Sequence, residues 1–422
     1  MKNDRSFKNI LMVSMGGMLD VYDFIVYAVM SRYISDVFFP NEDSMTSLIS
    51  TFAIFAIGYL ARPVGGIIFG HLGDKYGRVK LFSYSILLMA FSTFFIGLIP
   101  SYTSIGIYST LLITFFRLLQ GLALGGEFPG AITYITEFSV EKSGKNAGYM
   151  FCSMWLGAVL GSLTLSVLLL KFTHPEMLQF GWRIPFFISG VLGLFGFFIR
   201  TRLIESPDFS MVKRIERVPL WIVLRNKKVD VLVGIFVVAI NSATFYSLWF
   251  FLPDYLVKIV GETKPYLHWY ITLGLLLSSL FCVPFGYLAD RLSISRFVRL
   301  VCLLAILLPF PIYSLYMIKG NIFIASVVLS AVLSAISAVV IPKFLFRLFA
   351  TNIRYTGISI CYNFANAIFG GFAPMASLLL IKESGSNMAP PVYIIGLGVV
   401  ALIATTIFYR VSNRVINRTK TT

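Results

Sequence analysis

The stretch Gly70-His-Leu-Gly-Asp-Lys-Tyr-Gly-Arg-Val-Lys80 is a polar, glycine-rich break in a chain that is mostly apolar. A similar stretch, Gly286-Tyr-Leu-Ala-Asp-Arg291, begins 216 residues later, which is close to half of the 422-residue chain. Each copy follows a long apolar run. An internal repeat of this kind predicts a transporter fold with two related halves and a site between them, near the bilayer midplane.

The composition indicates a membrane protein. Hydrophobic residues make up 57% of the chain and charged residues 13%, whereas soluble domains carry about 25% charged residues. The net charge of +16 could suggest nucleic-acid binding, but the basic residues are scattered between apolar runs, which is typical of a topology signal. The four cysteines lie in apolar runs without CxxC spacing, so we expect them to be small apolar core residues.

Apolar runs long enough to span a bilayer occur twelve times, because a span needs about 20 mostly apolar residues. We therefore expect an all-α membrane protein with twelve transmembrane helices in two six-helix, pseudo-symmetric halves. The halves are residues 1–200 and 231–422, joined by the basic cytoplasmic linker 201–230. The expected spans are 11–37, 46–69, 80–99, 105–136, 147–170, 183–200, 231–257, 267–289, 298–318, 321–346, 356–381 and 392–410.

The distribution of lysine and arginine predicts the orientation. If the N-terminus is cytoplasmic, 26 of the 35 basic residues fall in cytoplasmic segments and 5 in external ones. Cytoplasmic loops carry the excess of basic residues, so both termini are predicted to lie in the cytoplasm.

Three carboxylates lie inside apolar runs, where a charge costs roughly 2.5 to 3.5 kcal/mol at a helix centre. Asp20 and Asp23 are three residues apart and so share a helix face, with Tyr27 between them in angle. The third is Glu127. Two neighbouring carboxylates in a low dielectric are not expected both to stay ionised, so we assign Asp20, Asp23 and Glu127 to proton coupling. The alternative is a permanent pair with an arginine.

Arg117, Gln120, Leu124 and Glu127 fall within an arc of about 80° on one helix, which predicts that they point inward. The planar fork of Arg117 matches two carboxylate oxygens, so we expect it to bind a substrate carboxylate, with Gln120 and Tyr27 nearby. The alternative is a fixed salt bridge to one of the three acids. Arg62 is expected to pair or snorkel rather than bind substrate.

The second half offers polar groups within its apolar runs that could contact substrate or hydrogen-bond across helices. The candidates for substrate contact are Asn241, Tyr246, Tyr362, Asn363 and Asn366. Few cations lie mid-span in this half, which favours a monocarboxylate or zwitterion over an acid with several carboxylates.

The segment Gly70–Lys80 resembles the loop motif between the second and third helices of the major facilitator superfamily, and Gly70, Asp74, Gly77 and Arg78 fall in register. The second copy is degenerate and keeps Asp290 and Arg291. Further stretches resemble the metabolite:proton symporter family, which includes proline/betaine, citrate, 2-oxoglutarate and shikimate permeases. These are MLDVYDFIVY (18–27), ARPVGGIIFG (61–70), IPSYTSIGIY (99–108), RLLQGLALGGEFPGAITYITE (117–137), GWRIPFF (181–187) and IRYTGISICYN (353–363).

The resemblance implies a proton-coupled importer of a small carboxylate-bearing solute. It also implies that Asp74 and Arg78 take part in a charge-paired cytoplasmic gate, with Glu137 as partner and with Gly70, Gly77, Asp290 and Arg291 in the two loop copies. Asp20 stands where relatives often carry Glu, which keeps the charge but shortens its reach.

We therefore expect a secondary active transporter that works by alternating access and takes up a small carboxylate or zwitterion together with protons. The alternatives are efflux of a metabolite, siderophore or drug by proton antiport, and a non-transporting membrane sensor. No nucleophile triad, phosphate loop or metal cluster indicates an enzyme. We expect no cofactor beyond the proton gradient, no nucleic-acid partner, a monomer, and a multi-pass location in a bacterial inner membrane.

Overall fold

The computed structural model describes residues 2–39, 44–138, 142–211, 218–258, 261, 267–318 and 323–420, and within these ranges the ordered elements are helices. The all-α architecture expected from the apolar runs is therefore confirmed. Several basic residues used to predict the orientation lie outside the described residues. These are Lys213, Arg214, Arg217, Lys264 and Lys319.

The N-terminal half contains six long helical spans. They are α1 (Lys2–Val29) with its continuation α2 (Ser31–Phe38), α3 (Ser44–Tyr76), α4 (Arg78–Leu98), α6 (Ile107–Phe138), α7 (Ser143–Lys171) and α9 (Ile184–Arg200). The short elements α5 (Tyr102–Ile105), α8 (His174–Gln179) and η1 (Gly181–Arg183) connect spans at one end of the bundle. The linker carries α10 (Pro207–Ser210) and α11 (Pro219–Asn226).

The C-terminal half repeats this arrangement with more interruptions. Its spans are α12 (Lys228–Phe245) with η2 (Tyr246–Phe251) and α13 (Leu252–Lys258); α14 (Leu267–Arg291); α15 (Ile294–Leu307) with α16 (Pro309–Met317); α17 (Phe323–Leu348); α18 (Arg354–Ala365) with η4 (Asn366–Gly370) and α19 (Ala373–Ser384); and α20 (Pro391–Lys420). The short η3 (Thr351–Ile353) precedes α18.

Eleven helical segments of the described residues are long and apolar enough to cross a membrane. The twelfth long helix is α3, whose 33 residues correspond to about 50 Å of helix, well over a bilayer core. The twelve helices therefore match the twelve apolar runs of the sequence.

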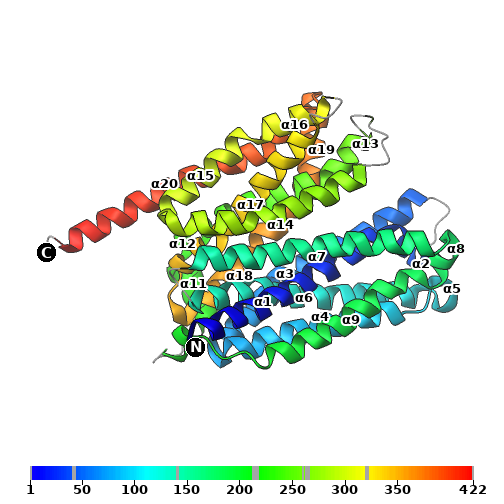
Figure 1. The fold of residues 1–422 in the computed structure, drawn as a ribbon, viewed down its shortest axis with the longest axis horizontal. Coiled ribbons are helices and arrows are strands. Elements are labelled where there is room, and N and C mark those ends of the chain that lie inside the picture. The colour runs from blue at the N-terminus through cyan, green and yellow to red at the C-terminus, as the bar shows by residue number, and fades with distance from the viewer. Residues whose placement is uncertain are drawn as a thin grey trace.

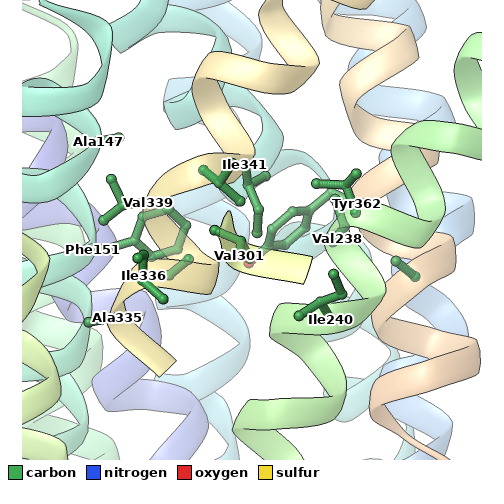
Figure 2. Close-up of a cluster of buried hydrophobic side chains, with 14 of the residues drawn as sticks. Ala147, Phe151, Val238, Ile240, Val301, Ala335, Ile336, Val339, Ile341 and Tyr362 are labelled. Carbon is green, nitrogen blue, oxygen red and sulfur yellow. The ribbon is translucent and has the colours of Figure 1, made fainter. Parts of the chain in front are cut away.

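The two halves lie side by side along their lengths, and both termini lie at the same end of the bundle, which we call the termini end (Figure 1). Two helix pairs make most of the contact between the halves: α3 packs on α18, and α7 packs on α14. A buried apolar cluster continues across this junction. In Figure 2, Phe151 of α7 lies against Val339 and Ile336 of α17.

Several expected spans are not single α-helices. The run 11–37 is divided into α1 and α2 by a turn at Met30. Pro309 splits the run 298–318, because a proline disfavours helical geometry in the preceding residue. The runs 231–257 and 356–381 each contain one π-helical segment, η2 and η4, in which the helical turn is wider. Such segments are frequent at functional sites, and each begins at a residue that lines the cavity described below.

Candidate functional site

A central cavity of about 80 Å³ lies between the two halves. One ordered water needs roughly 10 to 15 Å³ by this measure, so the cavity has room for a small solute. Side chains from α1, α3, α6 and α7 of the first half and from α12, η2, α18 and η4 of the second form its wall. The lining residues are Val21, Phe24, Tyr59, Arg62, Leu124, Phe128, Phe151, Met154, Trp155, Ala158, Asn241, Ser242, Phe245, Tyr246, Tyr362 and Asn366.

Arg62 is the charged residue of this wall, and the described lining contains no carboxylate. Its guanidinium lies 5.4 Å from the ring centre of Tyr59 and 5.6 Å from that of Phe128. The side chain is only 4% exposed, and its Nε has no hydrogen-bond partner among the described residues. A buried guanidinium with a free donor and no acid beside it is suited to bind an anionic group. We expected Arg62 to pair with an acid or to snorkel, but the structure places its side chain in the wall of the cavity.

Aromatic side chains form much of the remaining wall. Trp155 packs edge-on against Phe245 at 5.0 Å, and Phe128 stacks on Tyr362 at 5.7 Å. Tyr59 of α3 hydrogen-bonds Tyr246 of η2 and so links the two halves beside Arg62. Ring faces attract cations, and cages of such rings are a common way to bind quaternary ammonium groups.

A buried ionic cluster of the first half lies next to the cavity wall. Arg200 Nη1 forms an ion pair with Glu127 Oε1, and Arg200 Nη2 lies 3.8 Å from Asp20 Oδ2. Ser85 donates a hydrogen bond to the other oxygen of Glu127. Neither oxygen of Asp20 accepts a hydrogen bond from the described residues. Two carboxylates thus share one arginine, which leaves an excess negative charge that one proton would neutralise.

Arg200 is the site residue that the sequence reasoning placed wrongly. The charge count took it as a cytoplasmic charge at the edge of the linker, but its side chain is fully buried at the last turn of α9. Gly16 of α1 makes room for it, since a Cβ at that position would lie 1.9 Å from Arg200 Nη2. A basic residue at the end of an apolar run is typical of a topology signal. The buried partners of Arg200, on α1 and α6, are distant in sequence, so no local pattern predicts the pairing.

Asp23 belongs to a different network from Asp20. Thr93 donates to Asp23 Oδ2 at 3.1 Å, Gln120 donates to Thr93 at 2.6 Å, and Arg117 donates to Gln120 at 2.8 Å. The guanidinium of Arg117 lies 3.6 Å from the ring centre of Tyr27. Arg117 and Gln120 line a smaller neighbouring pocket, which shares Tyr59 and Arg62 with the central cavity. The expected single cluster of three acids is therefore two separate networks.

Four of the five residues proposed for solute contact in the second half line the cavity: Asn241, Tyr246, Tyr362 and Asn366. The fifth, Asn363, does not. Its amide donates to the backbone carbonyls of Gly125 at 2.7 Å and Ser359 at 2.9 Å. The shared helix face of Asn363 and Asn366 is interrupted by the start of η4, which places them in different surroundings.

Asp74 connects the first loop motif to the opposite half at the termini end. Its carboxylate accepts hydrogen bonds from the backbone of Tyr355 at 3.2 Å and of Thr356 at 2.8 Å, and from the Thr356 hydroxyl at 2.8 Å. These groups belong to the first turn of α18, where unpaired N–H groups favour a negative charge. Gly77 has φ +106°, a conformation that favours glycine and lets α4 begin at Arg78.

Arg78 and Glu137 complete the closure at this end. Arg78 forms ion pairs with Asp74 and Glu137 and donates to the carbonyl of Thr351. Glu137 also pairs with Arg354 of α18, which in turn lies 3.1 Å from Asp208 of the linker. All of these charges except Asp208 are buried. The structure thus brings together three of the gate residues proposed from the sequence, Asp74, Arg78 and Glu137, and it adds Arg354.

The second loop motif makes the matching contact on the other side. Asp290 accepts hydrogen bonds from the backbone N–H groups of Gly144 and Lys145, both at 2.8 Å, at the start of α7. Lys343 lies 3.6 Å from the same carboxylate. Gly286 packs against Gly144, while Arg291 is exposed and makes no ion pair within the described part of the chain. Each Asp of the repeat therefore caps a helix of the opposite half.

Comparisons with known proteins place the chain among transporters. It is 31% identical over 423 residues to the proline/betaine transporter of Escherichia coli K12, covering 96% of this chain and 84% of that protein. It is 32% identical over 412 residues to a Staphylococcus aureus MSSA476 protein whose assignment as a proline/betaine transporter is provisional, covering 95% of this chain and 88% of that one.

Solved structures share the fold. The proton:xylose symporter XylE bound to 6-bromo-6-deoxy-D-glucose superposes with a TM-score of 0.76 at 14% identity, covering 97% of this chain and 96% of that one. The inward open conformation of XylE from E. coli gives 0.65 at 16% identity, covering 96% and 95%. These likenesses confirm the twelve-helix, two-half fold. The sequence profile of the Major Facilitator Superfamily matches residues 16–320, and with these relatives it shows that the chain belongs to this superfamily of membrane transporters.

Proposed function

We propose that the chain is a proton-coupled symporter that takes up a small zwitterion with a carboxylate and a substituted ammonium group, of the proline or betaine kind. The names of its curated relatives support this class. The observation that carries the proposal is the cavity wall, in which the cation Arg62 is surrounded by aromatic rings and two amides.

In this proposal Arg62 binds the carboxylate of the solute. A charge-assisted hydrogen bond to a guanidinium is worth about 1.5 to 3 kcal/mol. The ammonium end faces Trp155, Tyr362 and Phe245, whose ring faces attract a cation without the need for a carboxylate. A second carboxylate on the solute would find no further cation in the described wall, so we expect dicarboxylates to bind more weakly than zwitterions.

The proton binds at the Asp20–Glu127–Arg200 cluster, beside the cavity. Glu127 has an arginine and a serine as partners, whereas Asp20 accepts no hydrogen bond from the described part of the chain, so Asp20 is the group that takes up the proton. Val21 and Phe128, the chain neighbours of Asp20 and Glu127, line the cavity. A change in this cluster is thereby transmitted to the solute site over one residue.

The two halves rock about the cavity, and the termini end faces the cytoplasm of a bacterial cell. The excess of basic residues at that end supports this orientation. The capped, ion-paired contacts of Asp74 and Asp290 hold the cytoplasmic side closed, which is the state that receives solute from outside. The transporter acts as a monomer and needs no cofactor, since each half supplies part of the single site.

The test is uptake of labelled proline and glycine betaine into proteoliposomes with an imposed inward proton gradient. Accumulation is expected for one of these solutes, it should collapse with an uncoupler, and succinate should not compete. Accumulation that survives the uncoupler would contradict symport. Proton-driven release from loaded vesicles, without uptake, would favour antiport and efflux instead.

A further inference from the structure

The carbonyl of Gly125 is left without its normal partner inside α6. In an α-helix this oxygen would accept a hydrogen bond from the N–H of residue 129, but that residue is proline, which has none. An unpaired carbonyl in a dry helix interior costs free energy, because no water replaces the missing donor. The sequence Gly-Gly-Glu-Phe-Pro (125–129) therefore presents a free acceptor just before Glu127.

The opposite half supplies the missing donor. Asn363 of α18, which is fully buried, donates from Nδ2 to the Gly125 carbonyl at 2.7 Å. Two turns earlier on the same helix, the Tyr355 hydroxyl donates to the Gly126 carbonyl at 2.7 Å. Two consecutive carbonyls of one half are thus bound by side chains of the other.

Glycines make this close approach possible. A Cβ at Gly66 would lie 2.3 Å from Asn363 Nδ2, and a Cβ at Gly130 would lie 2.8 Å from the Tyr355 hydroxyl. A Cβ at Gly125 would lie 2.2 Å from the Arg62 carbonyl of α3. Three helices, α3, α6 and α18, therefore meet at a junction where any larger residue would separate them.

We propose that Asn363 and Tyr355 are positioning residues that tie closure of the termini end to the segment of α6 carrying Glu127. The inference rests on the proposed function only in that Glu127 belongs to the proton site. When the halves separate at the termini end, α18 leaves α3 and α6, and the Gly125 carbonyl loses its donor until water enters. The junction therefore favours the closed state of the termini end. It also links that state to the backbone next to Glu127, the residue that pairs with Arg200.

A double-mutant cycle tests this link. Asn363→Leu keeps the branching of the side chain but removes the donor, and Pro129→Ala supplies an N–H that bonds Gly125 within α6. Ser359→Ala is the matched control. Ser359 lies one turn before Asn363 on α18, and its buried hydroxyl has no hydrogen-bond partner among the described residues. Hydrogen–deuterium exchange of the purified full-length protein, measured at the first turn of α18, reports opening and needs no substrate.

For Asn363→Leu we expect exchange at Tyr355 and Thr356 to rise about 5- to 150-fold, the range for a buried carbonyl that loses its donor. In the Pro129→Ala background the same substitution should change exchange less than two-fold, roughly, since the carbonyl is already bonded. Ser359→Ala should match the wild type. Additive effects of the two substitutions, or unchanged exchange in Asn363→Leu, would overturn the proposal.

Transport separates this role from solute binding. In proteoliposomes, Asn363→Leu should keep solute counterflow at the wild-type KM but lower the proton-driven accumulation ratio several-fold. A raised KM for counterflow would make Asn363 a binding residue and overturn the positioning role. Failure of the proposed function would appear differently, as absence of proton-driven uptake in the wild type, while the exchange result would stand by itself.

Discussion

The two halves of the molecule are alike at the termini end and unlike in the middle. At the termini end, Asp74 and Asp290 of the repeated loops cap α18 and α7 in the opposite half. In the middle, the buried charges of the described residues lie in the first half, and the second half contributes neutral polar and aromatic groups. The mid-bundle charges are Asp20, Asp23, Arg62, Arg117, Glu127 and Arg200.

This difference shows that the repeat preserved the helix caps between the halves and not the buried charges. Contact between the halves at the termini end is strengthened when each half caps a helix of the other. Proton binding needs charges that remain close together throughout the cycle, and placing them all in one half avoids breaking a buried ion pair when the halves separate. Breaking such a pair costs about 3 to 5 kcal/mol.

The largest expected effect is at Asp20. Asp20→Asn removes the proposed proton acceptor, so the variant should exchange solute in counterflow but lose accumulation against a gradient entirely. Asp36→Asn, an exposed acid on the continuation α2, is the control. Wild-type accumulation by Asp20→Asn would show that the proton site is not this cluster, and Asp23→Asn would then be the next variant to measure.

Arg200 tests whether the charges of the first half support one another. Arg200→Gln leaves Glu127 and Asp20 without a cation in a dry site, so stability should fall by about 3 to 5 kcal/mol. Thermal unfolding in detergent measures this loss. Arg202→Gln, at an exposed position two residues away, should unfold like the wild type. The double variant R200Q/E127Q should recover part of the loss, and a double variant no more stable than R200Q would argue against pairing.

Arg62 and Arg117 separate the solute site from the network around Asp23. Arg62→Gln should raise the KM for solute by about 10- to 100-fold, as expected for the loss of a charge-assisted hydrogen bond. Arg117→Gln should raise it less, because Arg117 lies in the neighbouring pocket. Uptake kinetics in proteoliposomes distinguish the two, and the reverse order would return the carboxylate site to Arg117.

The two caps provide a direct comparison of the halves at the termini end. Asp74 accepts three hydrogen bonds from α18 and Asp290 two from α7, so Asp74→Asn should open this end more than Asp290→Asn. A charge at a helix N-terminus is worth about 0.3 to 2 kcal/mol, which corresponds to less than about 30-fold in population. Hydrogen exchange at the two capped helices measures both, and equal effects would contradict the ranking.

The smallest expected effect is at the aromatic wall. Trp155→Leu should weaken betaine binding by about two- to five-fold through loss of a cation–π contact. Trp221→Leu, on the exposed face of α11, should leave the KM unchanged. If Trp155→Leu weakens an uncharged competitor just as much, the ring acts by shape rather than by attraction to the cation.

Much of the fold followed from local patterns. Twelve apolar runs predicted twelve helices, and the repeated Gly–Asp loops predicted two halves, because both signals depend on residues adjacent in sequence. The residue types of the site were also predicted, since a carboxylate or amide in an apolar run is conspicuous. The grouping of those residues was not, as the separate networks of Asp20 and Asp23 illustrate.

The sequence by itself therefore determined the bilayer environment, the helix count, the repeat and the presence of buried acids, because each has a local cost or period. Only the tertiary structure decided the partners. Arg200 looks like a topology charge until α9 packs on α1 and α4 and its side chain pairs with Glu127 of α6. Arg62 looks like a snorkelling residue until it is placed in the cavity wall. Asn363 looks like a solute ligand until Pro129, on another helix, leaves a carbonyl for it to bind. Partners of this kind depend on close approach between distant segments, which no local pattern records.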